Sequence, residues 1–194
     1  MNVSRETAER LIRYGQLLTK WNRRLNLVSP DTIASLDTRH IADSEQLLRH
    51  AEADGRWIDL GSGGGLPAVV IAILRRNGRD MILIESDRRK CEFLRTARRE
   101  LALEYEILPE RIETASPGNA AIVSARALAP LPRLLELAVR HGTEGTQYLF
   151  PKGQSWRSEI EAARKDWHFD VQTAPSETDP SAAILSIRNV RPQA

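Results

Sequence analysis

The residues with the clearest chemical potential lie at positions 57–67, where a short apolar run ends in a glycine-rich turn. Four of the five residues from Gly61 to Gly65 are glycines, so the backbone can adopt positive φ and a ligand can approach it closely. A helix behind the turn would direct free N–H groups and its positive dipole end at the same space. This pattern predicts a nucleotide-type ligand site, whereas a plain tight turn would need only one or two glycines.

The spacing of the glycines narrows the class of ligand. The dinucleotide fingerprint G-x-G-x-x-G needs a third glycine where this chain has Leu66, and no G-K-[ST] follows to make a Walker loop. Asp59 would repel a pyrophosphate but tolerates the ammonium group of an amino acid. A second apolar run ends in Glu85, roughly 20 residues after the loop, where a carboxylate accepts hydrogen bonds from ribose hydroxyls. These features predict an adenosine-containing ligand and favour S-adenosylmethionine over a dinucleotide.

The elements that must position these residues follow from hydrophobic periodicity. Ser4 is a suitable N-cap for an amphipathic helix that reaches about Leu25. Further helices are expected at 38–51, 66–76, 87–100, 133–140 and 158–167, with a short one beginning at Ser29-Pro30. Strands are expected from 57 and at 81–84, 105–108, 121–124, 146–150, 169–173 and 183–187. The pattern predicts an α/β domain at 53–194, with residues 1–52 as a helical cap on the same domain because no Pro/Gly linker separates them.

Composition excludes several classes of protein. A chain of 194 residues fits one domain with a sizeable core, and no apolar run approaches the roughly 20 residues of a membrane span. Residues 1–13 do not resemble a signal peptide, and a single cysteine, Cys91, suits a reducing, cytoplasmic environment and is expected in the core. The four histidines lack metal-ligand spacing, so no metal is expected.

The cationic residues leave two interpretations open. Net charge is only +2, but lysine supplies just four of the 28 basic residues, and arginine suits phosphate and guanine contacts. A GC-rich genome would produce the same bias. Six cations gather in the helix expected at 87–100, which is either a solvated face or a surface that contacts an RNA backbone: Arg88, Arg89, Lys90, Arg95, Arg98 and Arg99.

The glycine-rich stretch carries a resemblance to a known family. Residues 59–67, DLGSGGGLP, look like motif I of class I methyltransferases, in the form D-x-G-[ST]-G-x-G-x-P. This form resembles the RsmG (GidB) family of bacterial 16S ribosomal RNA guanine-N7 methyltransferases. Other stretches match in order, at 26–29, 39–44, 85–86 with 90 and 93–95, 111–113, 125–127 with 130–131, and 152–153. The resemblance covers about residues 10 to 188, with Ala68 where the family usually has glycine.

The resemblance implies a fold, a cofactor and a substrate. The fold would be a Rossmann-like class I methyltransferase fold, a mostly parallel seven-stranded sheet with helices on both faces plus an N-terminal helical cap. The cofactor would be S-adenosylmethionine, and the substrate guanine 527 of 16S rRNA in the small ribosomal subunit, bound by a monomer. Ile112 and Glu113 would flank the adenine. The cofactor-binding residues would be Asp59, Gly61, Ser62, Gly63, Gly65, Leu66, Glu85, Ile112, Glu113 and Arg126.

The chain lacks the residues that other methyltransferases use to activate a base. In class I enzymes the end of the fourth strand faces the transferred methyl, and here it carries Arg126 without an [ND]-P-P-[YF] motif or a cysteine nucleophile. Guanine N7 has a lone pair and no proton to lose, so no general base is required. Arg126 and Lys152 are expected to position the reactants, although Arg126 could be a surface arginine. Lys152 is also grouped with Arg88, Arg89, Lys90 and Arg95 as a candidate RNA-binding residue.

Two further questions stay open at this level. His40 and Asp43 lie one helical turn apart, either as a structural pair or as part of the cofactor pocket. The competing functions are an NAD-type oxidoreductase, a binding protein that has lost catalysis, and a methyltransferase for a small molecule or a protein.

Overall fold

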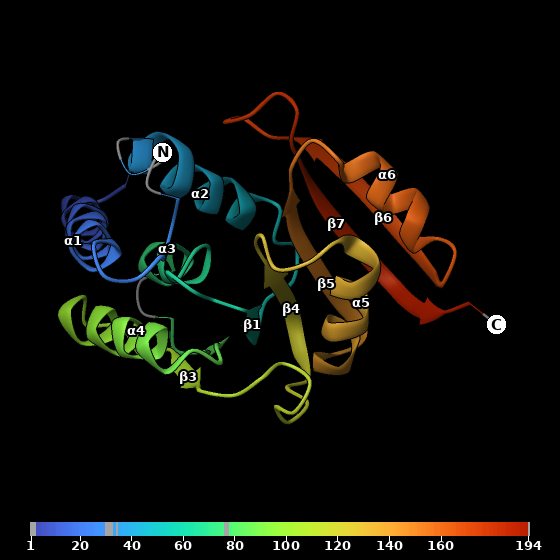
Figure 1. Ribbon diagram of the computed structural model, residues 1–194, viewed down its shortest axis with the longest axis horizontal. Coiled ribbons are helices and arrows are strands. Elements are labelled where there is room, and N and C mark those ends of the chain that lie inside the picture. The colour runs from blue at the N-terminus through green and yellow to red at the C-terminus, as the bar shows by residue number, and fades with distance from the viewer. Residues whose placement is uncertain (1–2, 30–32, 34, 76–77, 194) are drawn as a thin grey trace.

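A seven-stranded sheet runs through the centre of the molecule in the order β3-β2-β1-β4-β5-β7-β6 (Figure 1). The structure, a computed structural model, describes residues 3–29, 33, 35–75 and 78–193. The strands are β1 Trp57–Leu60, β2 Met81–Ile84, β3 Glu106–Leu108, β4 Ala120–Ala125, β5 Gly142–Lys152, β6 Trp167–Pro175 and β7 Ala183–Pro192. All neighbouring pairs are parallel except the two that involve β7, which runs antiparallel to β5 and β6.

The helices cover both faces of this sheet, as predicted. They are α1 Arg5–Asn22, α2 Ala42–Arg49, α3 Ala68–Leu74, α4 Arg88–Glu100, α5 Leu131–Ala138 and α6 Trp156–Ala163, with a π-helix at Leu36–Ile41 and a 3₁₀ turn at Val139–His141. Helices α1 to α4 lie on one side of the sheet and α5 and α6 on the other (Figure 1). Side chains alternate accordingly: Trp57 packs on the first side and Ile58 on the second.

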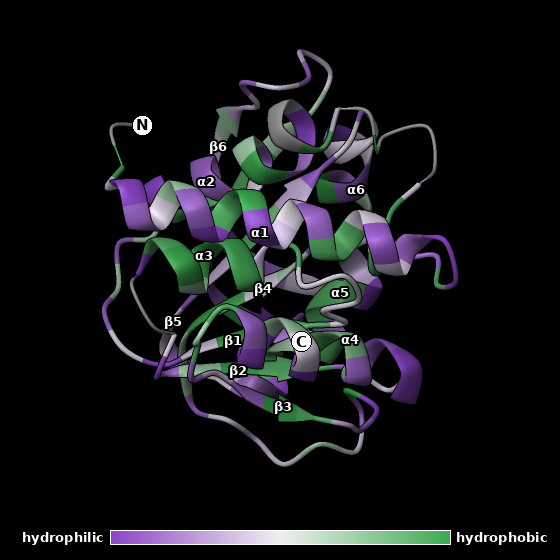
Figure 2. Cartoon of the chain, turned by 90° about the vertical axis from the view of Figure 1, so that its left-hand side faces the viewer, coloured by the Kyte–Doolittle hydropathy of each residue, from purple (hydrophilic) through white to green (hydrophobic). Residues whose placement is uncertain are grey.

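Helix α3 is the innermost element of the first face. Its residues from Ala68 to Ile73 are all buried, and Figure 2 shows it as apolar along its length, between the amphipathic α1 and the central strands. A helix that is apolar all round must be covered on every side. Helix α1 supplies that cover, and its Tyr14 and Leu18 belong to the same core as α3 and α4. The shared core supports the prediction that residues 1–52 form part of the same domain.

The ends of several helices differ from the sequence-based expectation for identifiable reasons. Helix α1 ends at Asn22, not near Leu25, because the Asn22 side chain accepts hydrogen bonds from the backbone N–H groups of Leu27 and Val28. Helix α5 begins two residues early, since Pro132 is tolerated in a first turn. The expected helix 38–51 is divided into a π-helical turn and α2.

Some expectations fall where the structure makes no statement. The short helix expected from Ser29-Pro30 lies largely outside the described residues, as do the end of the crossover helix at Arg76 and the Asn77 part of the turn. Cys91 is buried, and its thiol lies 3.1 Å from the Glu85 carbonyl oxygen. Within the described ranges, no helix is both long and apolar enough to cross a bilayer.

Candidate functional site

The carboxyl ends of β1, β2 and β4 meet at one edge of the sheet, where the strand order reverses. Leu60 is paired with Ile84 on one side and with Ala125 on the other. In open α/β sheets this switch point is where ligands bind. A cavity of about 320 Å³, called here the smaller cavity, lies there. It is lined by Gly61, Ile84, Glu85, Ser86, Lys90, Glu110, Arg111, Ile112, Glu113, Arg126, Ala127, Leu128 and Leu137.

Five of the ten predicted cofactor-binding residues line the smaller cavity, and the other five lie in or beneath the glycine loop. The lining residues are Gly61, Glu85, Ile112, Glu113 and Arg126. Asp59, Ser62, Gly65 and Leu66 are buried, and Gly63 is half-buried. Leu66 packs its side chain into the core beside α3, so only its backbone is available to a ligand.

The glycine loop uses its glycines for two different purposes. Gly65 has φ +79°, and a Cβ there would lie 2.4 Å from the Val69 side chain, so a tight turn into α3 requires glycine. Gly64 has no unusual φ, but a Cβ there would press against Leu18 at 3.1 Å and Leu27 at 3.2 Å. Gly64 therefore allows the N-terminal cap to pack closely against the loop.

A buried hydrogen bond fixes the cap to the same loop. The Tyr14 hydroxyl donates to the Gly64 carbonyl oxygen at 2.6 Å, and Tyr14 is fully buried. The sequence gives no local signal for this contact, because the two residues are 50 positions apart. The cap thus supports the ligand-binding loop directly.

Asp59 lies beneath the loop with one carboxylate oxygen satisfied. Its Oδ1 accepts a hydrogen bond from the Ser124 hydroxyl at 2.6 Å, and that hydroxyl accepts one from the Trp57 indole N–H at 2.8 Å. Among the described residues no partner reaches the buried Oδ2. Burial raises the pKa of the Asp59 carboxyl to about 6, although the Ser124 hydrogen bond and the Arg126 charge act in the opposite direction. An unsatisfied buried acceptor fits a ligand that brings a cation or a bridging water.

Glu85 connects the glycine loop to the start of α4. Its Oε2 accepts from the Gly63 N–H and its Oε1 from the Asp87 N–H, both at 2.8 Å. Each oxygen keeps a further lone pair. The carboxylate is therefore held rigidly at the cavity wall with acceptor capacity left for ligand hydroxyls.

The far wall of the smaller cavity is held by a histidine that sequence reasoning missed. His141 is fully buried, and its Nε2 lies 3.1 Å from the Ile112 carbonyl oxygen. Burial lowers the pKa of His141, so it is neutral and donates through Nε2 to that carbonyl. Glu113, by contrast, is exposed and paired with Arg133 at 2.9 Å. No motif points to His141, since it follows α5 and reaches Ile112 only in the folded chain.

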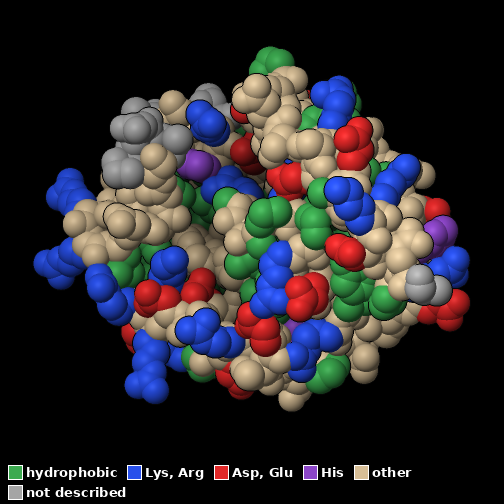
Figure 3. Space-filling view, turned by 45° about the vertical axis from the view of Figure 1, so that its right-hand side comes forward, with side chains coloured by type: hydrophobic (Ala, Val, Ile, Leu, Met, Phe, Trp, Pro, Cys, Tyr) green, Lys and Arg blue, Asp and Glu red, His purple; other side chains and the backbone are tan. Residues whose placement is uncertain are grey.

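Arg126 lies at the boundary between the smaller cavity and a second, larger one. The larger cavity has a volume of about 720 Å³ and includes residues of the cap, β4, β5 and the loop between β6 and β7. Arg126 and Ala127 line both cavities. Ala127 has φ +52°, a strained conformation for a residue with a side chain, and such strain gathers at functional sites. Figure 3 shows a hollow in this face, with cationic and acidic side chains around it.

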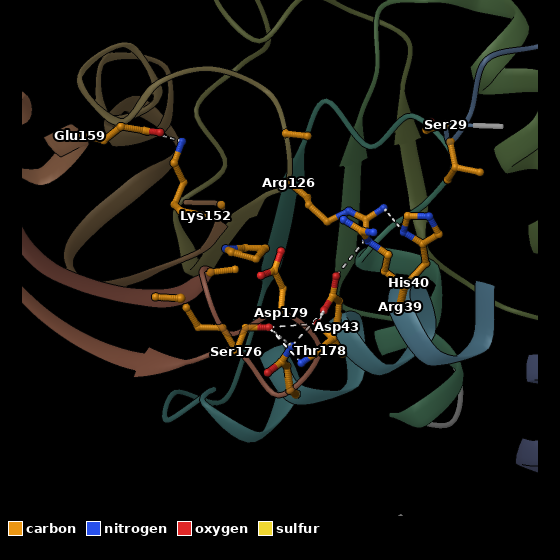
Figure 4. A pocket seen from close by; sticks show the side chains of 18 of the residues that line it. Ser29, Arg39, His40, Asp43, Arg126, Lys152, Glu159, Ser176, Thr178 and Asp179 are labelled. Atoms are coloured by element: carbon orange, nitrogen blue, oxygen red, sulfur yellow. Dashed lines mark hydrogen bonds and ion pairs between the residues drawn. The ribbon is translucent and has the colours of Figure 1, made fainter. Parts of the chain in front are cut away.

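His40 and Asp43 hold the Arg126 guanidinium (Figure 4). One guanidinium nitrogen lies 2.9 Å from His40 Nδ1 and another lies 3.8 Å from Asp43 Oδ2. Burial and the nearby Arg126 and Arg39 charges lower the pKa of His40 to about 4, so its neutral ring accepts the hydrogen bond from Arg126. The pair proposed as structural or ligand-lining therefore supports Arg126 from the larger cavity.

Lys152 lines the larger cavity but is fully engaged by protein groups. Its Nζ lies 2.6 Å from Glu159 Oε2 and donates to the Ala129 carbonyl at 2.8 Å, and its side chain is only 11% exposed. Glu159 also accepts from the Leu131 N–H at 2.9 Å. These contacts fix the segment that follows Arg126, so Lys152 is placed to support that segment.

The predicted RNA-binding cations on α4 divide into two groups. Arg88 and Arg89 are exposed at the start of the helix, and the Arg89 guanidinium donates to the Arg24 carbonyl at the end of α1. Lys90 lines the smaller cavity, and Arg95 forms an ion pair with Glu92. Figure 3 shows Lys and Arg side chains along the edge of the molecule that Figure 1 assigns to α1 and α4. This edge is continuous with the glycine loop that α1 and α4 flank.

The fold and the site together define a class I methyltransferase. The sheet order, the glycine loop between β1 and α3, and the acidic residue at the end of β2 all belong to that class. Solved structures support the fold. A ribosomal protein L11 methylase from Lactobacillus delbrueckii subsp. bulgaricus has a TM-score of 0.61 at 16% identity, covering 79% of this chain and 78% of that one. A mutant of MtNAS in complex with S-adenosylmethionine also gives 0.61, at 13% identity, covering 94% and 75%.

Comparison with known sequences identifies the family. Residues 7–182 match the GidB family, described as rRNA small subunit methyltransferase G. A ribosomal RNA small subunit methyltransferase G from Paracoccus denitrificans (strain Pd 1222) is 50% identical, covering 98% of this chain and 99% of the relative. Its counterpart in Gluconobacter oxydans (strain 621H) is 48% identical, covering 97% of each. The chain belongs to the rRNA small subunit methyltransferase G family, which confirms the resemblance drawn from its motifs.

Proposed function

We propose that this chain transfers the methyl group of S-adenosylmethionine to N7 of a guanine in 16S ribosomal RNA. The observation that carries the proposal is the shared wall at Arg126 and Ala127. One side of this wall has the features of a nucleoside site, and the other opens into a cavity more than twice as large. Family membership supports the ribosomal RNA of the small subunit as the substrate.

The residues around the smaller cavity fit the proposed cofactor. The unpartnered Asp59 Oδ2 suits the amino-acid ammonium, directly or through one water. Glu85 offers its remaining lone pairs to the ribose hydroxyls, beside the Gly63 N–H that already binds it. Ile112 supplies apolar cover for the adenine, held by His141. When bound, S-adenosylmethionine supplies an electrophilic methyl group on its sulfonium.

The chain's own contribution to the reaction is positioning. Guanine N7 carries a lone pair and no proton, so a base is not required, and no carboxylate or histidine needs to accept one. Arg126 is anchored by His40 and Asp43 at the boundary and orients the groups on either side of it. Oriented reactants can gain roughly 7–11 kcal/mol of barrier in this way. Burial of the boundary also keeps water away from the reacting atoms.

The substrate class follows from the shape and charge of the outer surface. An unpaired, splayed base can enter a cavity and be read by side chains far better than a paired one. Arg88 and Arg89 would contact the RNA backbone next to the glycine loop, with Lys90, Arg95 and Lys152 supporting that edge from less exposed positions. By family resemblance the target is guanine 527 in the small subunit, methylated in the cytoplasm by a monomer that needs no metal.

Transfer of labelled methyl tests this function. Small ribosomal subunits from cells that lack the enzyme are mixed with the protein and methyl-labelled S-adenosylmethionine, with large subunits as the control. Incorporation into 16S rRNA alone is expected. Incorporation into ribosomal protein, or equal labelling of both subunits, would contradict the proposal.

A further inference from the structure

The loop between β6 and β7 forms one wall of the larger cavity and is docked onto α2. Gln46 Oε1 accepts from the Glu177 N–H at 3.0 Å, and the Gln46 amide contacts the Ser176 hydroxyl at 3.3 Å. Thr178 donates to Asp43, and Arg49 pairs with Glu177 at 2.6 Å. The loop is therefore held in place from the side that faces the cap.

Three carboxylates line the larger cavity, and two of them are already occupied. Asp43 contacts Gln46, Thr178 and Arg126, and both oxygens of Glu159 accept hydrogen bonds, from Ser155, Leu131 and Lys152. Asp179 differs. Its Oδ1 accepts from the Ser181 N–H at 2.9 Å and the Ser181 hydroxyl at 2.7 Å, while in the described parts of the chain no hydrogen bond or ion pair reaches Oδ2.

Asp179 is held ready to receive a donor. Its own carbonyl accepts from the Ala182 N–H at 3.0 Å, which fixes the backbone of the turn. Figure 4 shows its side chain projecting into the cavity between Arg126 and Lys152. The two Ser181 hydrogen bonds lower the pKa of the Asp179 carboxyl, so it is ionised at neutral pH. A fixed, ionised carboxylate in a base-sized cavity needs hydrogen-bond donors from what enters.

We propose that Asp179 selects guanine by accepting hydrogen bonds from its N1–H and N2–H groups. These two donors lie on the Watson–Crick edge, opposite the edge that carries N7, so a base read by Asp179 can present N7 toward Arg126 and the smaller cavity. Adenine presents an unprotonated N1 at the same position, which a carboxylate repels. This inference rests on the proposed function and adds the residue that sets the base specificity.

The same contact would favour the reaction itself. Methylation of N7 places positive charge on the purine, which makes N1–H and N2–H stronger donors. A carboxylate that binds them therefore interacts more strongly as the methyl is transferred, and only such interactions accelerate the chemical step. The effect of losing Asp179 should appear in kcat as well as in KM.

Replacement of the target guanine by inosine, which lacks only the N2 amine, tests the proposal. Small subunits are reconstituted with 16S rRNA carrying one inosine at the target, and kcat/KM is compared with that of the guanine substrate. The wild-type protein should lose about 10-fold with inosine, and Asp179→Asn should lose roughly 10- to 100-fold on guanine. The variant should no longer discriminate between the two bases. Asparagine keeps the acceptor for Ser181, so the turn is preserved.

Matched variants separate recognition from loop structure. Ser181→Ala removes the hydroxyl contact and keeps the carboxylate, and Glu177→Gln changes a carboxylate of the same loop that pairs with Arg49. Both should keep the guanine/inosine ratio of the wild type. Asp179→Ser serves as a second variant if the first folds poorly, and cofactor affinity should be unchanged in all of them.

The outcomes distinguish this inference from the proposed function. Equal rates of the wild type on guanine and inosine, or a wild-type ratio in Asp179→Asn, would overturn the role of Asp179 while methylation stood. No transfer by the wild type to the guanine substrate would instead overturn the function on which the inference rests.

Discussion

Arg126 is the residue on which the site depends most. It lines both cavities, and its guanidinium is held by His40 and Asp43, each from the cap side. A long cationic side chain fixed at both ends acts as a rigid partition, because its rotamers are restricted by its partners. Displacement of reacting groups by about 1 Å can cost roughly 100-fold in rate.

Arg126→Ala should therefore lower kcat/KM at least about 100-fold while the protein stays folded. The matched control is Arg79→Ala, which removes an exposed arginine paired with Glu104 away from both cavities. Methyl transfer and the circular dichroism spectrum would be measured for both variants. Unchanged turnover in Arg126→Ala would remove it from the site.

Asp59 gives the site a pH dependence with a defined sign. Its pKa in the free protein is raised to about 6, so below that pH the carboxyl is neutral and cannot pair with a ligand ammonium. Binding a cation favours the ionised form, so affinity for S-adenosylmethionine should rise with pH up to about 6 and then level off. Calorimetric titration from pH 5 to 8 measures this profile.

Asp59→Asn should flatten that profile and weaken binding at pH 8 by roughly 10-fold, the loss of one charge-assisted contact. Asparagine keeps the acceptor for the Ser124 hydroxyl. A profile in the variant that still falls below pH 6 would assign the titration to another group.

At the level of elements, the N-terminal cap is a support for the glycine loop. Tyr14 donates to the Gly64 carbonyl, and Gly64 has no room for a side chain between Leu18 and Leu27. Asn22 ends α1 and fixes the chain that brings Leu27 against the loop. The helices that precede the sheet thus set the shape of a loop within it.

Tyr14→Phe should lower the free energy of unfolding by about 1–3 kcal/mol, because it leaves a buried carbonyl without its donor. Tyr148→Phe is the control, since no hydrogen bond reaches that hydroxyl within the described residues. Urea denaturation measures both. Equal stability of the two variants would mean that the Gly64 carbonyl finds another donor.

The sequence predicted these elements well where the pattern is local. Alternation of apolar runs located every strand, and Asp87 caps α4 as its position suggests. Contacts between distant segments were not predictable: the Tyr14–Gly64 bond, the hold of His141 on Ile112, and the docking of the β6–β7 loop onto α2. The motif located Arg126, but its partners became visible only when the cap was folded against β4.

At the scale of the whole molecule, the exposed cations of α4 lie at the edge beside the glycine loop. Electrostatic contacts to RNA backbone give affinity that falls steeply with salt. Arg88 and Arg89 are exposed on this edge, whereas α6 lies on the other side of the sheet.

Charge reversal of both residues, Arg88→Glu with Arg89→Glu, should raise KM for small subunits about 10-fold or more and reduce its salt dependence. Cofactor affinity should not change. The control reverses Arg157 and Arg164, which lie on and just after α6. Equal effects of the two double variants would place the RNA surface elsewhere.

The most direct test of the central claim is to locate the methyl group that the protein adds. Small subunits from cells lacking the enzyme are incubated with the protein and S-adenosylmethionine, and the 16S rRNA is digested with nuclease and examined by mass spectrometry. The account predicts a single 7-methylguanosine, in the fragment that contains guanine 527. A methyl group on another atom or another base, or no methyl at all despite measured cofactor binding, would contradict it.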